Sequence, residues 1–206
     1  MLAVLLALLI SPAGFAPDAV LARYTAGEAG RRAPAGVVEV EIEASLPHRA
    51  ERGRVLAIRH GAASYDVIRS EGDQTVKRQV IARYLAAAAR GGAMEASAVA
   101  VTPDNYKFRL VGSVESGGTL SYVFDIVPRK KRVGLMEGQI WIDVATGIAV
   151  REYGRMVKSP SVFLRRIEVL RDTSIRNGAP YLRITRLMID TRVAGPAELT
   201  IRESPQ

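Results

Sequence analysis

The fold is most constrained by one stretch in the second half of the chain, LSYVFDIVPRKKRVGLMEGQIWIDVATGIAVR. Large apolar residues alternate with small or polar ones over residues 120–127, and again over 139–144. A turn rich in Pro, Arg and Lys separates these two runs, and Thr146-Gly147 leads into a third. Alternation with a period of two, closed by Pro and Gly turns, is typical of antiparallel strands with one buried face. The stretch therefore predicts three consecutive antiparallel strands.

Further segments on both sides of this stretch have the composition of strands. They are residues 38–44, 52–60, 64–69, 106–110, 162–172, 181–191 and 197–203. Asn177-Gly178 between two of them favours a tight type I′ hairpin turn. The chain is therefore predicted to be mainly β, with about nine to eleven antiparallel strands.

One segment of the mature chain has a clear helical period. Between residues 73 and 90 the apolar residues recur at spacings that place them on one face of a helix. Asp73 is a suitable N-cap, and Gly91-Gly92 ends the pattern. A weaker helical or irregular piece covers residues 93–100. The fold class is thus α+β, with one main amphipathic helix against a sheet.

The N-terminus has the pattern of a secretory signal peptide. Residues 1–22 contain an apolar run too short to span a bilayer, then small residues with possible cleavage after Ala16 or Ala22. Pro17 follows the first site, so Ala22 is preferred. The chain has no cysteine, which excludes a lipid anchor through an N-terminal Cys. We expect a periplasmic protein in which 23–36 is a flexible lead-in and 37–206 is a single domain.

The sequence carries none of the motifs that usually indicate an enzyme. It has two histidines and no nucleophile elbow, phosphate-binding loop, dinucleotide fingerprint or zinc-binding helix motif. No catalytic residue, metal or cofactor is therefore predicted, and His60 and Asp143 are expected to be a surface residue and a turn residue. The net charge of +8 favours anionic partners, but no nucleic-acid-binding module is present.

The strands around residue 140 resemble the LolA-like outer-membrane lipoprotein-sorting family. That family carries Y-x-x-x-x-x-P-(K/R), then (I/V)-W-(I/V/L)-D, then T-G-x-x-(V/L)-R. Here the matching residues are Tyr122 with Pro128-Arg129, Ile140-Trp141-Ile142-Asp143, and Thr146-Gly147 with Val150-Arg151. The resemblance covers residues 105–203. It implies a curved, incomplete antiparallel barrel with helices across its open side.

The resemblance also implies a function, which is carriage of lipids or lipoproteins without chemistry. Members of the family hold acyl chains between the sheet and the helical lid. The corresponding candidate lipid-binding residues here are Val76, Val80, Tyr84 and Leu85 from the helix, with Phe108, Leu110, Tyr122, Phe124, Ile126, Ile140 and Ile142 from the sheet. From the residues alone, the same apolar faces favour a packed core over a ligand cavity.

Two alternatives remain open at this point. The chain could be an envelope sensor or regulatory interaction module of the same fold, with a packed interior and a protein partner. It could also bind an anionic envelope polymer, or contact the membrane surface transiently, through the turn Arg129, Lys130, Lys131 and Arg132. The same turn is also compatible with a purely solvated loop.

Overall fold

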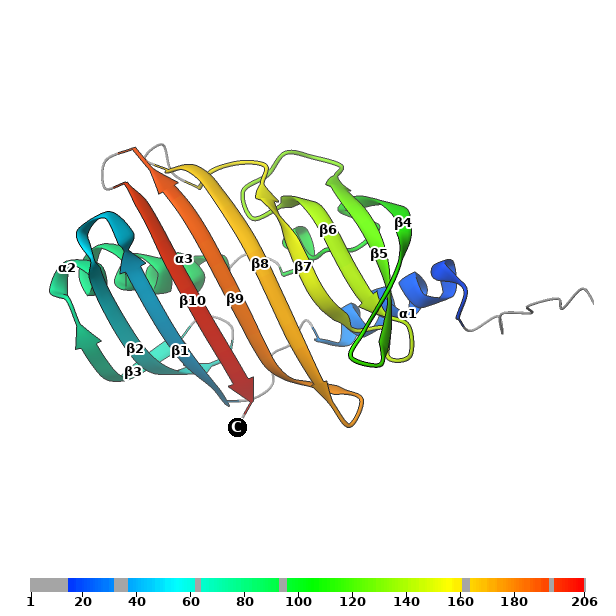
Figure 1. Ribbon diagram of the computed structural model, residues 1–206, viewed down its shortest axis with the longest axis horizontal. Helices are drawn as coiled ribbons and strands as arrows, with labels where there is room; N and C mark the ends of the chain where they lie inside the picture. The colour runs from blue at the N-terminus through cyan, green and yellow to red at the C-terminus, as the bar shows by residue number, and fades with distance from the viewer. Residues whose placement is uncertain are drawn as a thin grey trace, which may run out of the picture.

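A single open antiparallel sheet forms the frame of the molecule. The structure, a computed structural model, describes residues 15–31, 37–61, 64–92, 96–160, 164–192 and 195–205. Within these residues ten strands lie in the order β3-β2-β1-β10-β9-β8-β7-β6-β5-β4, and all neighbours are antiparallel (Figure 1). The two edge strands, β3 and β4, do not pair with each other, so the barrel is incomplete as predicted.

The strands are β1 (Val37–Leu46), β2 (Glu51–His60), β3 (Ser64–Gly72), β4 (Tyr106–Ser116), β5 (Thr119–Pro128), β6 (Met136–Asp143), β7 (Ala149–Met156), β8 (Leu164–Arg176), β9 (Ala179–Thr191) and β10 (Pro196–Pro205). The helical elements are α1 (Pro17–Arg31), the 3-10 turn η2 (Pro47–Arg49), α2 (Gln74–Val76), the π-helical turn η3 (Lys77–Ile81), α3 (Ala82–Gly92) and α4 (Ala96–Val99).

The order of the strands explains how a chain with few long-range connections makes one sheet. β4 to β10 form a meander in which each strand pairs with the next one along the chain. The last strand, β10, then pairs with β1, whose residue Ile42 lies opposite Ile201. The tight turns follow the sequence signals, because Asn177 and Gly178 both have positive φ, as a type I′ turn requires.

The predicted helix at residues 73–90 is present, with one irregularity. α2, η3 and α3 follow one another without a break, and the π turn occupies the middle of the apolar run. The Asp73 side chain accepts a hydrogen bond of 2.9 Å from the backbone N–H of Val76, which confirms the predicted N-cap. The described part of the weaker prediction at 93–100 contains the short helix α4 (Ala96–Val99), and residues 93–95 lie outside the described residues.

The prediction of a flexible lead-in at residues 23–36 is wrong for its described part. Pro17–Arg31 form α1, and Tyr24 is 1% exposed because its ring packs against the sheet. The Arg23 guanidinium donates hydrogen bonds of 3.0 and 2.9 Å to the carbonyls of Val144 and Ala145. Residues 32–36 lie outside the described residues. Ala- and Gly-rich composition suggested a loop, but tertiary contacts with β6 and its following turn stabilise a helix.

All the long helices lie on one side of the sheet, which we call the inner face (Figure 1). Two hydrophobic clusters occupy this face. The first, the α1 cluster, joins Val20 and Tyr24 of α1 to apolar residues of β4–β9. The second, the α3 cluster, joins α2, η3 and α3 to β1, β2 and β10. Leu187 and Ile189 of β9 contact both clusters, so the core is continuous along the middle of the sheet.

Candidate functional site

The candidate lipid-binding residues do not form one surface. The structure places them as follows: Val76, Val80, Tyr84 and Leu85 in the α3 cluster, and Phe108, Tyr122, Phe124, Ile126, Ile140 and Ile142 in the α1 cluster. The expectation that the helix at 73–90 faces the strands around residue 140 is therefore wrong. The helix at 73–90 covers β1, β2 and β10. The strands around residue 140 are covered by α1 instead.

Leu110 is the one candidate from the sheet that belongs to neither cluster. Its side chain is 46% exposed, although it lies opposite Phe124 in the register of β4 and β5. The reason is its place on an edge strand, where the register shifts between Leu110 and Gly112. Leu110 itself precedes the shift and shares the face of the buried Phe124, so its exposure follows from the edge position, where the described residues place no strand on the other side of β4.

Away from the contact that Leu187 and Ile189 make, a row of polar side chains lies between the two clusters on the inner face. The sheet register brings Glu152 of β7 opposite Arg171 of β8, and Arg171 opposite Thr185 of β9. The next row holds Arg183 of β9 opposite Glu203 of β10. Together with Arg59 of β2, these residues are called the central polar strip. They are Arg59, Glu152, Arg171, Arg183, Thr185 and Glu203.

Two ion pairs neutralise most of this strip. The Arg171 guanidinium donates a 2.7 Å hydrogen bond to the Glu152 carboxylate, and Arg59 donates one of 2.6 Å to Glu203. The Glu152 side chain is only 10% exposed, whereas Arg171 is 31% exposed. Charges with so little access to water are costly to bury and are tolerated only when they are paired.

Both helical covers bring a tyrosine close to Arg171. The Glu152 carboxylate raises the pKa of Arg171 against the opposing effect of burial, and Glu203, Tyr84 and Tyr24 act in the same direction. Burial raises the pKa of Tyr84 well above its usual range, and Glu203 adds to this increase. The polar strip thus lies where α1, α3 and the sheet meet.

The period of the apolar residues alone does not reveal this strip. The signal was available in β8, where Ile167, Val169, Arg171 and Thr173 occupy successive inward positions. A charged residue at an inward position of a strand marks either a buried ion pair or a polar site.

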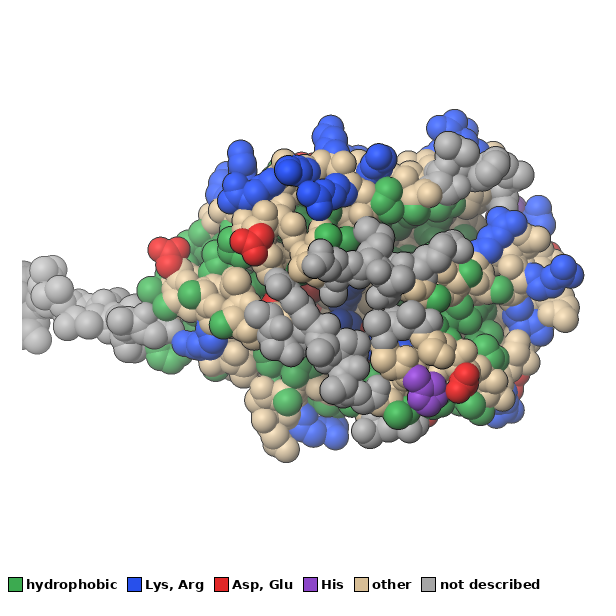
Figure 2. All heavy atoms as spheres, turned by 180° about the vertical axis from the view of Figure 1, so that it is seen from behind, with side chains coloured by type: hydrophobic (Ala, Val, Ile, Leu, Met, Phe, Trp, Pro, Cys, Tyr) green, Lys and Arg blue, Asp and Glu red, His purple; other side chains and the backbone are tan. Residues whose placement is uncertain are grey.

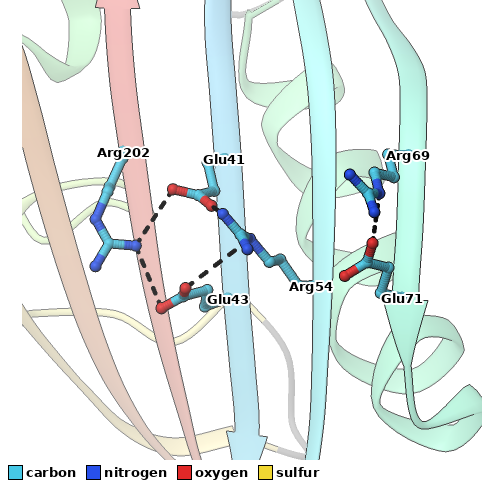
Figure 3. A network of polar contacts seen from close by, with 6 residues as sticks. All are labelled: Glu41, Glu43, Arg54, Arg69, Glu71 and Arg202. Carbon is cyan, nitrogen blue, oxygen red and sulfur yellow. Dashed lines mark hydrogen bonds and ion pairs between the residues drawn. The ribbon is translucent and has the colours of Figure 1, made fainter.

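The outer face of the sheet carries a separate network of charged side chains (Figure 3). Arg202 pairs with Glu41 and Glu43 at 3.5 and 3.2 Å, Arg54 pairs with the same two carboxylates, and Arg69 pairs with Glu71. An open depression of 490 Å³ adjoins this network and is lined by Glu43, Arg52, Arg54, Glu71, Glu198 and Thr200, among others. Since exposed ion pairs contribute little to stability, this network is chiefly a solvated surface.

The basic turn Arg129–Arg132 is exposed along its whole length. Arg129 Nε donates a 2.8 Å hydrogen bond to the carbonyl of Pro103, and its backbone N–H donates to the carbonyl of Asn105. Arg129 therefore fixes the turn to the segment before β4, while the three residues after it reach into solvent. Lys and Arg side chains gather along one margin of the helix-bearing side (Figure 2).

Two predictions about polar residues can be compared directly with the structure. Asp143 accepts a 2.7 Å hydrogen bond from the backbone N–H of Thr146, which confirms its predicted role in the turn. The His60 side chain is exposed, and its Nε2 lies 3.1 Å from Oδ2 of Asp66. Among the described residues, no group of three or more His, Asp or Glu side chains is arranged to hold a metal. In the same residues, no helix has the length and apolar character that crossing a membrane requires.

Comparisons with known proteins give similarity of fold only. No family model and no curated protein matches the chain. A LolA superfamily protein from Nitrosomonas europaea has a similar structure, with 15% identity, a TM-score of 0.43, and 91% of this chain and 90% of that chain covered. MucB in complex with MucA(peri) gives 11% identity and a TM-score of 0.27, with 92% and 93% covered. The MucA/MucB complex of Pseudomonas aeruginosa gives 12% identity and a TM-score of 0.30, with 91% of this chain and 93% of that chain covered. The chain is thus distantly similar in structure to a LolA superfamily protein and to MucB, and such low values carry no argument about function.

Proposed function

We propose that this chain is a periplasmic carrier that holds acyl chains of a lipid or lipoprotein against the inner face of its sheet, without catalysis. The observation that carries the proposal is the way this face is covered. Two separate helices, and not a second sheet, shield the apolar side chains of an open ten-stranded sheet. The sequence resemblance around residues 122–151 supports the same function.

The contacts of the α3 cluster favour a helical cover whose apolar contacts with the sheet can be replaced by those of an acyl chain. Within the described residues, polar contacts between this helix and the sheet occur only at its start, where the Asp73 N–H donates a 2.7 Å hydrogen bond to the carbonyl of Arg52 and the Asp73 side chain caps the helix. The remainder of the helix contacts the sheet through Val76, Val80, Ile81, Tyr84 and Leu85. An acyl chain gains about 0.8 kcal/mol for each buried CH₂, so a long chain can compensate for contacts of this kind.

The proposed mechanism is a rotation of α2, η3 and α3 away from β1, β2 and β10. Gly72 provides the pivot, because its φ of +85° is a backbone conformation that residues with a side chain rarely adopt. A chain entering beneath α3 would lie against Ile42, Val55 and Ile201, and Leu187 and Ile189 would guide it toward the α1 cluster.

The test is native mass spectrometry of the purified protein after exposure to an envelope lipid extract. We expect one or more bound lipids that survive gentle desolvation. Tyr84→Asp is expected to weaken retention, since it places a charge in the α3 cluster. Arg83→Asp is the matched control, because Arg83 is exposed on the same helix.

A second variant keeps the test decisive if Tyr84→Asp fails to fold. Leu85→Gln is a milder change of the same helical face, and circular dichroism would establish that it remains folded. Absence of bound lipid in the native protein, under conditions where a known lipid carrier is loaded, would refute the proposal.

The edge strands favour one alternative, a non-enzymatic sensor or regulatory module that binds an envelope protein. Val67 and Ile68 of β3 are 53% and 62% exposed, and Val111 of β4 is 54% exposed. Exposed edge strands can pair with an extended segment of another protein. If the native protein binds no lipid, and Val111→Lys abolishes binding of an envelope protein that the native chain binds directly, this alternative replaces the carrier.

The exposed turn at residues 129–132 supports a further alternative, binding of an anionic envelope polymer. Such binding would fall steeply with salt, since exposed charges are screened within about 8 Å at physiological ionic strength. Replacing Lys130, Lys131 and Arg132 by Gln tests it without disturbing the hydrogen bonds of Arg129.

A further inference from the structure

The charges of the central polar strip do not balance. The strands place three guanidinium groups on this part of the inner face, those of Arg59, Arg171 and Arg183, but only two carboxylates, Glu152 and Glu203. Arg171 is paired with Glu152, and Arg59 with Glu203. Within the described part of the chain, no hydrogen bond or ion pair engages the Arg183 guanidinium. One positive charge is therefore uncompensated there.

A second observation at the same place points to a missing acceptor. Arg59 Nε is buried and has no hydrogen-bond partner among the described residues, although another nitrogen of the same guanidinium donates to Glu203. Buried donors are nearly always satisfied in folded proteins, so an orphan of this kind needs an explanation. An oxygen-rich group beside Glu203 would accept from it.

The surroundings of the strip are apolar in both directions along the sheet. Phe124 and Ile140 follow Glu152 in the row toward β4, and Ile201 and Ile42 follow Thr185 in the row toward β3. Residues of this kind suit hydrocarbon. A molecule lying over the strip would therefore meet a polar centre with an excess positive charge between two hydrophobic regions.

We propose that the central polar strip is a head-group site for amphiphiles that carry a single negative charge, with Arg183 and Arg59 Nε as the anchoring donors. This inference rests on the proposed carriage of acyl chains and adds the class of head group. In this site the acidic group of the ligand lies beside Arg183 and Glu203. Thr173 and Thr185 offer hydroxyl groups to it. The hydrocarbon chain of the ligand extends into either hydrophobic cluster. Arg171 stays paired with Glu152 and keeps that carboxylate from repelling the ligand.

The experiment compares amphiphiles that share one chain and differ in charge. The probes are hexadecanoate, hexadecyl sulfate, methyl hexadecanoate and hexadecyltrimethylammonium, each below its micellar concentration, with acetate and inorganic phosphate as anions without a chain. Binding is measured by isothermal calorimetry on the full chain. We expect the two anionic amphiphiles to bind about tenfold more tightly than the methyl ester, because a hydrogen bond to a charged group is worth that much. Acetate and phosphate should bind far more weakly than either.

Arg183→Gln is the decisive variant, because it removes the uncompensated charge and leaves both ion pairs in place. Binding of the methyl ester should stay unchanged while the anionic preference falls to near unity. Arg186→Gln is the matched control, since Arg186 lies on the same strand, faces the outer side and pairs with Asp172 at 2.9 Å. It should leave the preference intact.

Each other outcome contradicts the inference in a recognisable way. Equal binding of ester and anion by the native protein would reject the head-group site and leave the carrier function standing. An anionic preference that survives Arg183→Gln would place the recognition elsewhere. Tight binding of inorganic phosphate would identify a site for free anions. If none of the chains binds, the carrier function and the head-group site fail together.

Discussion

Arg171 and Glu152 form a 2.7 Å ion pair in the middle of the inner face, in a cross-strand row whose other members are mostly apolar. The pair lies between the two helical covers, within electrostatic reach of Tyr24 and Tyr84. Its position, where the α1 and α3 clusters meet, makes it the natural boundary between the two halves of the core.

Breaking this pair on one side should destabilise the fold more than replacing it. Glu152→Gln leaves the Arg171 guanidinium without its carboxylate, and we expect a loss of about 2 kcal/mol, less than for a fully buried pair because Arg171 is 31% exposed. The double variant Glu152→Leu, Arg171→Met should lie within about 1 kcal/mol of the native protein. Urea unfolding measures both. A single variant as stable as the native chain would show that the pair is effectively solvated.

The glycines of β6 and β7 provide a test of sheet packing. Gly138 and Gly154 are opposite each other, and a Cβ at Gly138 would lie 2.0 Å from the carbonyl oxygen of Tyr153. Because backbone atoms cannot rotate away, Gly138→Ala should cost at least about 3 kcal/mol. Gly112→Ala, where a Cβ meets nothing within 4 Å, should change the unfolding free energy by less than about 1 kcal/mol. Similar values for the two variants would show that this pair of strands is more widely spaced than described.

The N-terminal helix makes a prediction about processing. Cleavage after Ala22 would remove Val20, which is fully buried in the α1 cluster, and would divide α1. Cleavage after Ala16 would leave the helix whole. If a signal peptide is removed from this chain, we therefore expect the mature protein to begin at Pro17 or earlier, which N-terminal sequencing of the purified protein would determine.

Thermal unfolding of two truncated forms provides the matching physical test. The chain beginning at Arg23 should melt at a lower temperature than the chain beginning at Pro17, because it lacks Val20 and the first turns of α1. Equal melting temperatures, or a mature protein that begins at Arg23, would show that the first turns of α1 are not part of the folded core.

Tyr84 should make the protein sensitive to alkali. Its pKa in the folded protein is raised by burial and by Glu203, whereas in the unfolded chain it stays near the ordinary value of about 10. The unfolded state therefore loses this proton first, so the stabilisation is complete below pH 10 and is lost as the pH rises toward the folded pKa. Between pH 9 and 11.5 the native protein should lose stability more steeply than Tyr84→Phe. Parallel curves would mean that the Tyr84 hydroxyl is open to water.

Local patterns in the sequence were sufficient to predict most of the secondary structure. The strand segments, the Asp73 cap, the Asn177-Gly178 hairpin and the turn role of Asp143 were all predicted from nearby residues. These features depend on side-chain period and on bonds within a few positions, so the sequence contains them directly. The helix α1 was the exception, since composition alone gave no sign of its tertiary contacts.

Only the tertiary structure decided which helix covers which strands. The β10–β1 pairing brings the two ends of the domain together and places α2, η3 and α3 over β1, β2 and β10, while α1 reaches the strands around residue 140. The central polar strip arises in the same way, because Arg59, Arg171 and Glu203 are far apart in the chain and become neighbours only through the strand register. The period of apolar residues in the sequence predicts which face of a strand is buried. Which helix covers that face depends on the long-range pairing of the strands.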